Sequence, residues 1–146
     1  MAHTVAEQAL IETAKEYLRR VDAGRGDVAE LCTDDVEVYF PKFGIAKGKQ
    51  ALFELGSGLF TRVSEISHDQ QSLLCVANGD DVVVEGLSRG KTKSGVEWVG
   101  GNTPTGRFCN VFHFREGRID RVHIHLDPDY GGEDRDRFLW GTDRSW

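Results

Sequence analysis

Residues 108–119 read FCNVFHFREGRI, and this stretch decides the fold class. Its aromatic and β-branched residues predict a β-strand. Side chains alternate between the two faces of a strand, so Phe108, Asn110, Phe112 and Phe114 share one face. Because three of these four side chains are aromatic, we expect that face to be buried.

Asn110 is the polar residue on this otherwise aromatic face. A buried amide costs roughly 1–3 kcal/mol when its hydrogen bonds are not made. The side chain therefore either has a fixed partner, such as a backbone group, or contacts a ligand. The strand pattern alone leaves both interpretations open.

The remaining chain predicts helices first and strands afterwards. Thr4 and Glu7 form a capping-box pattern ahead of a helix that ends near Gly24. The further predicted elements are a short helix that Asp27 caps, running to Leu31, a strand Asp35–Pro41, a helix Gly48–Arg62, and strands Ile66–Val76, Asp81–Arg89, 108–114 and Arg118–Leu126, with tight turns at Asn78-Gly79 and Glu116-Gly117.

This order of elements predicts one α+β domain over residues 1–146, with residues 128–146 as a C-terminal tail. We expect a curved mixed or antiparallel sheet that forms a cone-shaped half-barrel. Three helices in the N-terminal half would cover an apolar pocket of the kind that binds small molecules. The tail aromatics Phe138, Trp140 and Trp146, with Leu139, need cover from the core or from a partner subunit.

Composition excludes several classes of function. The net charge is −6 and no cluster of lysines and arginines forms a basic face, so we expect no nucleic-acid partner. No apolar run approaches the roughly 20 residues that span a bilayer, so we expect no membrane partner. The cysteines Cys32, Cys75 and Cys109 are few and odd in number, which favours a reducing, cytoplasmic location.

Three stretches carry a resemblance to a known family: residues 17–27 (YLRRVDAGRGD), 34–41 (DDVEVYFP) and 111–119 (VFHFREGRI). Together with the order of elements over residues 4–127, they resemble the SnoaL-like group of the nuclear transport factor 2-like superfamily, near ketosteroid isomerase and the polyketide cyclases. The resemblance implies the cone-shaped fold. It says less about chemistry, since this fold hosts isomerases, dehydratases, cyclases, epoxide hydrolases and non-enzymes.

The same resemblance implies roles for four polar residues. Tyr17 falls where ketosteroid isomerase has its oxyanion-hole tyrosine, and Asn110 falls where that enzyme has a protonated aspartic acid. Phe40 occupies the position of the isomerase base, so we do not expect that reaction. Asp22 and His68 instead resemble the Asp–His dyad of hexachlorocyclohexane dehydrochlorinase, a competent general base near neutral pH. Without such a role, Asp22 would bond the following turn and His68 would be a partly exposed strand residue.

The last predicted strand carries His123, His125 and Asp127 on one face, with Val122, Ile124 and Leu126 on the other. The aliphatic residues favour their own face as the pocket side, which leaves no metal site in the pocket. His123 and His125, together with His113, would then lie on the outer face, where the resemblance implies a homodimer interface. A simple Glu116-Gly117 turn would place His123 beside Asn110, whereas a bulge would reverse this.

Two functions from different classes follow. The first is a cofactor-independent isomerase, cyclase or lyase acting on a small apolar cyclic carbonyl compound, with Tyr17, Asp22, His68 and Asn110 as catalytic residues. The pocket walls would be Phe40, Phe108, Phe112, Val122, Ile124 and Leu126. The second is a non-catalytic protein of the same shape that binds a small apolar molecule. The enzyme requires the four polar groups to converge on one cavity, whereas the binding protein does not.

Overall fold

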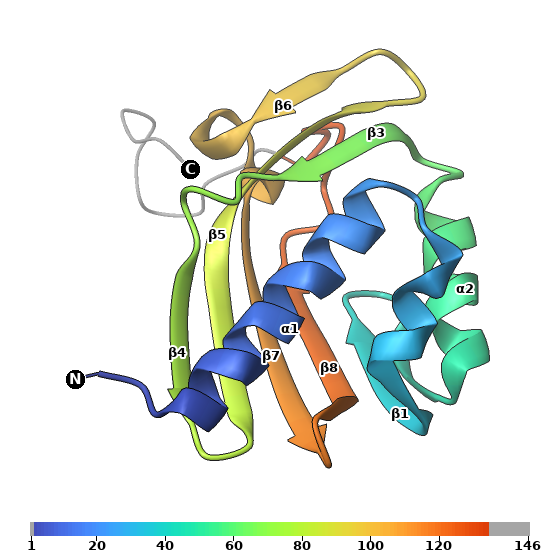
Figure 1. Ribbon diagram of the computed structural model, residues 1–146. Coiled ribbons are helices and arrows are strands. Elements are labelled where there is room, and N and C mark those ends of the chain that lie inside the picture. Colours follow the sequence, from blue (N-terminus) through green and yellow to red (C-terminus); the bar gives the residue numbers. More distant parts are fainter. Residues whose placement is uncertain (1, 135–146) are drawn as a thin grey trace.

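The computed structural model describes residues 2–134 and has the α+β architecture that the sequence predicts, with helices against one face of a curved mixed sheet (Figure 1). The elements are α1 (Val5–Asp22), η1 (Gly26–Leu31), β1 (Cys32–Phe40), β2 (Gly44–Lys47), α2 (Lys49–Leu59), β3 (Val63–His68), β4 (Leu74–Asn78), β5 (Asp81–Thr92), β6 (Glu97–Val99), η2 (Gly100–Asn102), η3 (Pro104–Gly106), β7 (Arg107–Arg115) and β8 (Arg118–Leu126). Phe138, Leu139, Trp140 and Trp146 lie outside the described residues.

Helix α1 begins with the predicted capping box. The Thr4 hydroxyl accepts the Glu7 N–H at 3.1 Å, and the Glu7 carboxylate accepts the Thr4 N–H at 2.8 Å. Its apolar stripe, which includes Ala14 and Tyr17, is buried against the sheet. The helix crosses the inner face of the sheet diagonally (Figure 1), so its C-terminal end at Asp22 meets β3.

The predicted cap at Asp27 is wrong. Residues 26–31 form a 3-10 helix whose first turn has no side-chain cap. Asp27 lies inside this helix rather than at its N-cap, which is Arg25, and the Asp27 carboxylate pairs with the guanidinium groups of Arg25 and Arg20. Helix α2 is shorter than the predicted 48–62, because Thr61 and Arg62 turn back toward β3 through bonds to the carbonyls of residues 58 and 59.

The single strand predicted over Ile66–Val76 is also wrong, since β3 and β4 are separate strands. Between them the Asp69 side chain and carbonyl accept the N–H groups of Gln71 and Ser72, each at 3.0 Å, which makes a turn. Both strands pair with β5, β4 along its first half and β3 along its second. The sequence predicted no strand at β6, which pairs with β5 beside β7.

The β7–β8 hairpin decides which residues face the core. The Glu116–Gly117 turn is tight as predicted, and Arg115 pairs with Arg118. A bulge between His113 and Phe114 then shifts the register, so Asn110 lies opposite Ile124 rather than His123. Phe108, Asn110, Phe112 and Phe114 are each at most 3% exposed, as the alternating pattern predicts.

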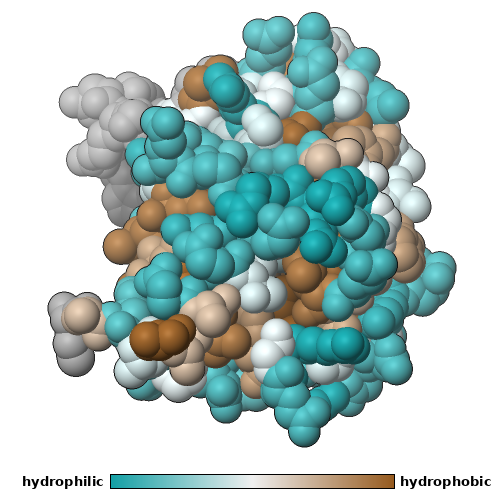
Figure 2. Space-filling view, viewed as in Figure 1, coloured by the Kyte–Doolittle hydropathy of each residue, from teal (hydrophilic) through white to brown (hydrophobic). Residues whose placement is uncertain are grey.

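The sheet order is β2-β1-β8-β7-β5-β3, and β1 runs parallel to β8. The main core lies between α1 and the inner face of the sheet. A second cluster, formed by Phe40, Val63, Trp98 and Tyr130, closes the wide end of the cone. The helix-bearing face is mainly hydrophilic, with separate smaller hydrophobic areas (Figure 2). Within residues 2–134, no helix is both long and apolar enough to cross a bilayer.

Candidate functional site

Asp22 and His68 form a hydrogen-bonded pair at the place where α1 meets β3. Asp22 Oδ1 lies 2.6 Å from His68 Nδ1, and Asp22 Oδ2 accepts the backbone N–H of His68 at 2.9 Å. Both side chains are mostly buried, with exposed fractions of 18% and 10%. The carboxylate thus fixes an imidazole that donates from Nδ1, and Nε2 has no partner among the described residues.

Aromatic contacts connect this pair to the inner face of β7. The His68 ring stands edge-on to Phe108, with ring centroids 4.6 Å apart. Two alternations further along β7, Phe112 makes a similar contact with Tyr17 at 5.4 Å. Asn110 lies between these two phenylalanines on the same face. The inner face of β7 therefore connects the four predicted polar residues, through the contacts of Phe108 with His68 and of Phe112 with Tyr17.

Neither Asn110 nor Tyr17 has a side-chain hydrogen bond to any described residue. The Asn110 side chain is 2% exposed and its carbonyl oxygen is buried without a partner. Its cross-strand neighbours, Val84 and Ile124, are apolar. The backbone partner that a purely structural asparagine needs is thus missing. Burial raises the pKa of the Tyr17 phenol, so this group keeps its proton and remains a donor.

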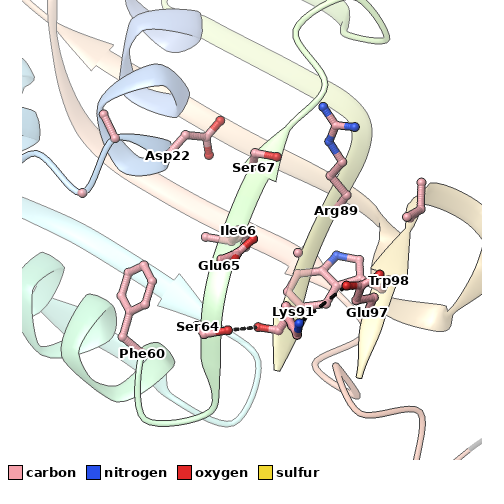
Figure 3. Close-up of a pocket in the computed structure, with 14 residues that line it drawn as sticks. Asp22, Phe60, Ser64, Glu65, Ile66, Ser67, Arg89, Lys91, Glu97 and Trp98 are labelled. Atoms are coloured by element: carbon pink, nitrogen blue, oxygen red, sulfur yellow. Dashed lines mark hydrogen bonds and ion pairs between the residues drawn. The ribbon is translucent and has the colours of Figure 1, made fainter. Parts of the chain in front are cut away.

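Of three hollows on the described part of the molecule, one is lined by Asp22 and none by Tyr17, His68 or Asn110. The groove beside Asp22 holds about 550 Å³ and runs from the end of α1 across β3. Asp22 points toward β3 beside Ser67, while Arg89 and Trp98 lie on the far side of that strand (Figure 3). Tyr17, His68 and Asn110 lie deeper, in or beside the packed core.

The six predicted wall residues all belong to the inner face, but three of them belong to the main core and three belong to or pack against the second cluster. Phe112 and Val122 are completely buried beneath α1. Phe40, Ile124 and Leu126 belong to or pack against the cluster at the wide end. The sixth, Phe108, is 3% exposed and borders a hollow of about 510 Å³.

The outer face carries the three histidines, as the aliphatic pattern predicts. His113 Nδ1 lies 2.6 Å from Asp120, and His123 Nε2 lies 2.8 Å from Glu37. The exposed His125 ring is 5.3 Å from that of Tyr39. No group of three or more His, Cys, Asp or Glu side chains in residues 2–134 is arranged to hold a metal ion.

Trp98 and Tyr130 were not assigned a place by sequence patterns, yet they close the wide end of the cone. Trp98 is completely buried, and its indole N–H donates to Ser88 Oγ at 3.2 Å. Its ring lies over Gly90, where a Cβ atom would come within 2.4 Å of it. Tyr130 packs against this ring at 4.9 Å. A glycine inside a strand often marks a close approach by another group, so Gly90 was the one sequence signal for the packing of Trp98 here.

Comparisons with known proteins identify the family and agree with the fold. A family model described as a SnoaL-like domain matches residues 14–122. A proposed polyketide cyclase from Xanthomonas campestris pv. campestris is 16% identical, with a TM-score of 0.72 over 84% of this chain and 93% of that one. A proposed SnoaL-like polyketide cyclase from Jannaschia sp. CCS1 is 16% identical, with a TM-score of 0.69 over 87% and 91%.

A third structure of this fold is TerC, which was crystallised with polyporic acid. It is 17% identical, with a TM-score of 0.71 over 82% of this chain and 92% of that chain. No curated protein matches the chain in sequence. At these identities the solved structures establish the shared fold and leave the chemistry to be argued from the residues.

Proposed function

Because the chain belongs to the family of SnoaL-like domains, we propose that it is a cofactor-independent acid–base enzyme of the isomerase, cyclase or lyase type. The substrate would be a small apolar cyclic carbonyl compound. The observation that carries this proposal is the Asp22–His68 pair, in which two hydrogen bonds fix a histidine whose second ring nitrogen has no partner among residues 2–134. The polyketide cyclases among the structural neighbours are consistent with this type of reaction.

In this proposal His68 Nε2 accepts a proton from the carbon next to the substrate carbonyl. Asp22 keeps the proton of Nδ1 in place and stabilises the imidazolium that forms. A positioned general base of this kind contributes about 10²–10⁴-fold to a rate. The edge-on ring of Phe108 restricts the rotation of the imidazole, so the lone pair keeps one direction.

Tyr17 and Asn110 would donate hydrogen bonds to the enolate oxygen. The raised pKa of Tyr17 keeps its hydroxyl protonated, and an amide needs no pKa shift to act as a donor. Both groups are buried and lack hydrogen-bond partners among residues 2–134, so a ligand oxygen would satisfy them. Removal of one such donor typically lowers a rate by about 10²–10³-fold.

A second candidate is a binding protein without catalysis. Phe40 stands where the resembling isomerase has its base, and Phe112 and Val122 are completely buried beneath α1. Tight packing at these positions leaves the substrate less room beside Asn110. In this alternative, the inner wall would bind an apolar ring and the Asp22–His68 pair would only join α1 to β3.

Deuterium exchange separates the two candidates without knowledge of the natural substrate. The purified protein is incubated in D2O with 2-tetralone, a bicyclic ketone with acidic protons beside the carbonyl, and exchange is followed by NMR. We expect catalysed exchange that His68→Asn abolishes, while His125→Asn on the outer face leaves it unchanged. Saturable ketone binding without exchange would favour the binding protein, and loss of exchange in both variants would contradict the assigned base.

We also propose that two copies associate through the outer sheet face. One row across the sheet consists of Ile45, Tyr39, His123, Val111, Val83 and Val76, which are neighbours in register on successive strands. Ile45 is 62% exposed and Val76 is 52% exposed. A continuous, largely apolar row of this kind is typical of a surface that a partner covers.

A further inference from the structure

We propose that the pocket between the β1–β2 turn and the end of α2 binds an organic anion with an apolar body, such as a carboxylate or sulfonate on a hydrocarbon ring or chain. This pocket, here called the turn pocket, holds about 560 Å³ and is lined by residues of four segments: 40–43, 55–62, 92–94 and 128–133. It shares no lining residue with the groove beside Asp22, and Phe40 is the one predicted wall residue that lines it. The proposal rests on the cations of this pocket and does not depend on the acid–base reaction.

The floor of the turn pocket is apolar. Phe40, Phe43, Leu55, Leu59 and Tyr130 line it, and all five belong to or pack against the cluster at the wide end of the cone. The volume is within the range of small-molecule sites, roughly 300–1,000 Å³. A hydrocarbon ring or short chain would therefore bury its surface against these side chains.

The rim is cationic although the chain is acidic overall. Lys42, Arg62 and Lys93 line the pocket, and none of them forms an ion pair with any described residue. Arg62 and Lys93 lie together, because the Lys93 N–H donates to the Arg62 carbonyl at 2.8 Å. Most cations elsewhere in residues 2–134 are paired, as Lys49 is with Asp34 at 3.1 Å, and the unpaired Arg89 and Arg118 do not line this pocket. Three unpaired cations around an apolar floor match an amphipathic anion.

The two acidic residues on the rim, Asp129 and Glu133, make their contacts within their own loop. Both Asp129 carboxylate oxygens accept backbone N–H groups, from Glu133 and Asp134, each at 2.8 Å. The Glu133 side chain lies along Gly131, where a Cβ atom would be 3.5 Å from both Cγ and Oε1. The Asp129 charge is thus engaged by backbone donors within the loop, so the cations dominate the rim.

The Lys42 backbone supplies an independent indication. Residues 40–43 form a turn in which the Phe43 N–H donates to the Phe40 carbonyl at 3.1 Å. Lys42 has φ 66°, in the left-handed region where a turn of this kind favours glycine. A lysine at this position is strained, and strained residues gather at ligand sites. The strain is explained if the ammonium group is retained at the rim to hold an anion.

A matched pair of fluorescent probes tests the charge requirement. 1-Anilinonaphthalene-8-sulfonate is an apolar anion, and N-phenyl-1-naphthylamine has the same aromatic body without the sulfonate. We expect the anion to bind more tightly, and its affinity to fall as salt rises from about 0.05 to 0.5 M. In NMR spectra the amide signals of Phe43 and Lys93 should shift on its addition, while that of Val111 should not.

Neutral substitutions locate the contribution of each cation. Lys42→Gln, Arg62→Gln and Lys93→Gln should each weaken sulfonate binding about fivefold and leave amine binding unchanged. Arg118→Gln removes an exposed arginine at the opposite hairpin and should have no effect. Equal affinity for the two probes, no sulfonate binding at about 1 mM, or equal loss in the Arg118 variant would overturn the proposal.

Lys42→Gly should raise the stability of the protein and weaken sulfonate binding at the same time. Glycine relieves the positive φ, so the melting temperature should rise by about 3 °C, while sulfonate affinity should fall as in the glutamine variant. A rise in melting temperature with unchanged affinity would show that the lysine is not held there for a ligand. Circular dichroism at each step confirms that every variant is folded.

Discussion

Replacing Asn110 with leucine should stabilise the protein and impair its site at the same time. The Asn110 amide is 2% exposed, makes no side-chain hydrogen bond to described residues and is surrounded by Phe108, Phe112, Val84 and Ile124. An unpaired buried amide costs roughly 1–3 kcal/mol, and leucine has nearly its shape. For a chain of this size, each kcal/mol corresponds to about 3 °C, so the melting temperature should rise by about 3–9 °C.

The same variant should lower deuterium exchange into 2-tetralone by about 100-fold, because one oxyanion donor is lost. Differential scanning calorimetry measures the first effect and NMR the second. Asn110→Ala is the control, since it also removes the amide but leaves a cavity, which should cancel the gain in stability. A melting temperature that falls by several degrees in Asn110→Leu, with ketone binding intact, would show that Asn110 is a structural core residue.

Four further outcomes are expected. Asp22→Asn should keep the hydrogen bond to the His68 backbone but turn an amide N–H toward His68 Nδ1. This moves the imidazole proton to Nε2, so deuterium exchange should fall at least about 100-fold. Unchanged exchange would exclude the dyad. Gly56→Ala in α2 should raise the free energy of unfolding by about 0.5–1 kcal/mol in urea titrations, because the added Cβ would meet nothing within 4 Å. Destabilisation would show that the alanine side chain does not fit this position of the helix. Burial raises the pKa of the Cys32 thiol to about 12, so the folded state keeps a proton that the unfolded state loses first. The free energy of unfolding should therefore fall as the pH rises above about 9. Cys32→Ala should make that slope shallower by about 1.4 kcal/mol per pH unit. Light scattering at micromolar concentration should find a dimer that Val111→Arg converts to monomer, and a monomeric parent protein would refute the outer-face interface.

Local sequence signals determined the elements that depend on neighbours along the chain. The Thr4–Glu7 capping box, the helical spacing of Ala14 and Tyr17, and the two-residue alternation around Asn110 all have the structure that they predict. The reason is that caps, turns and amphipathic periodicity act over a few residues. The resemblance to the SnoaL-like family supplied the pairing of Asp22 with His68, and the structure confirms their contact while their chemistry stays a prediction.

Only the tertiary structure decided the features that depend on pairing between distant segments. The bulge after His113 sets whether His123 faces Asn110, and a bulge is selected by packing on both faces of the sheet. The Asp69 turn separates β3 from β4 locally, but both strands pair with β5, and their own residues do not reveal that pairing. The turn pocket likewise needs four segments from 40–133 to meet, so its three cations are scattered in the sequence and gathered only by the fold.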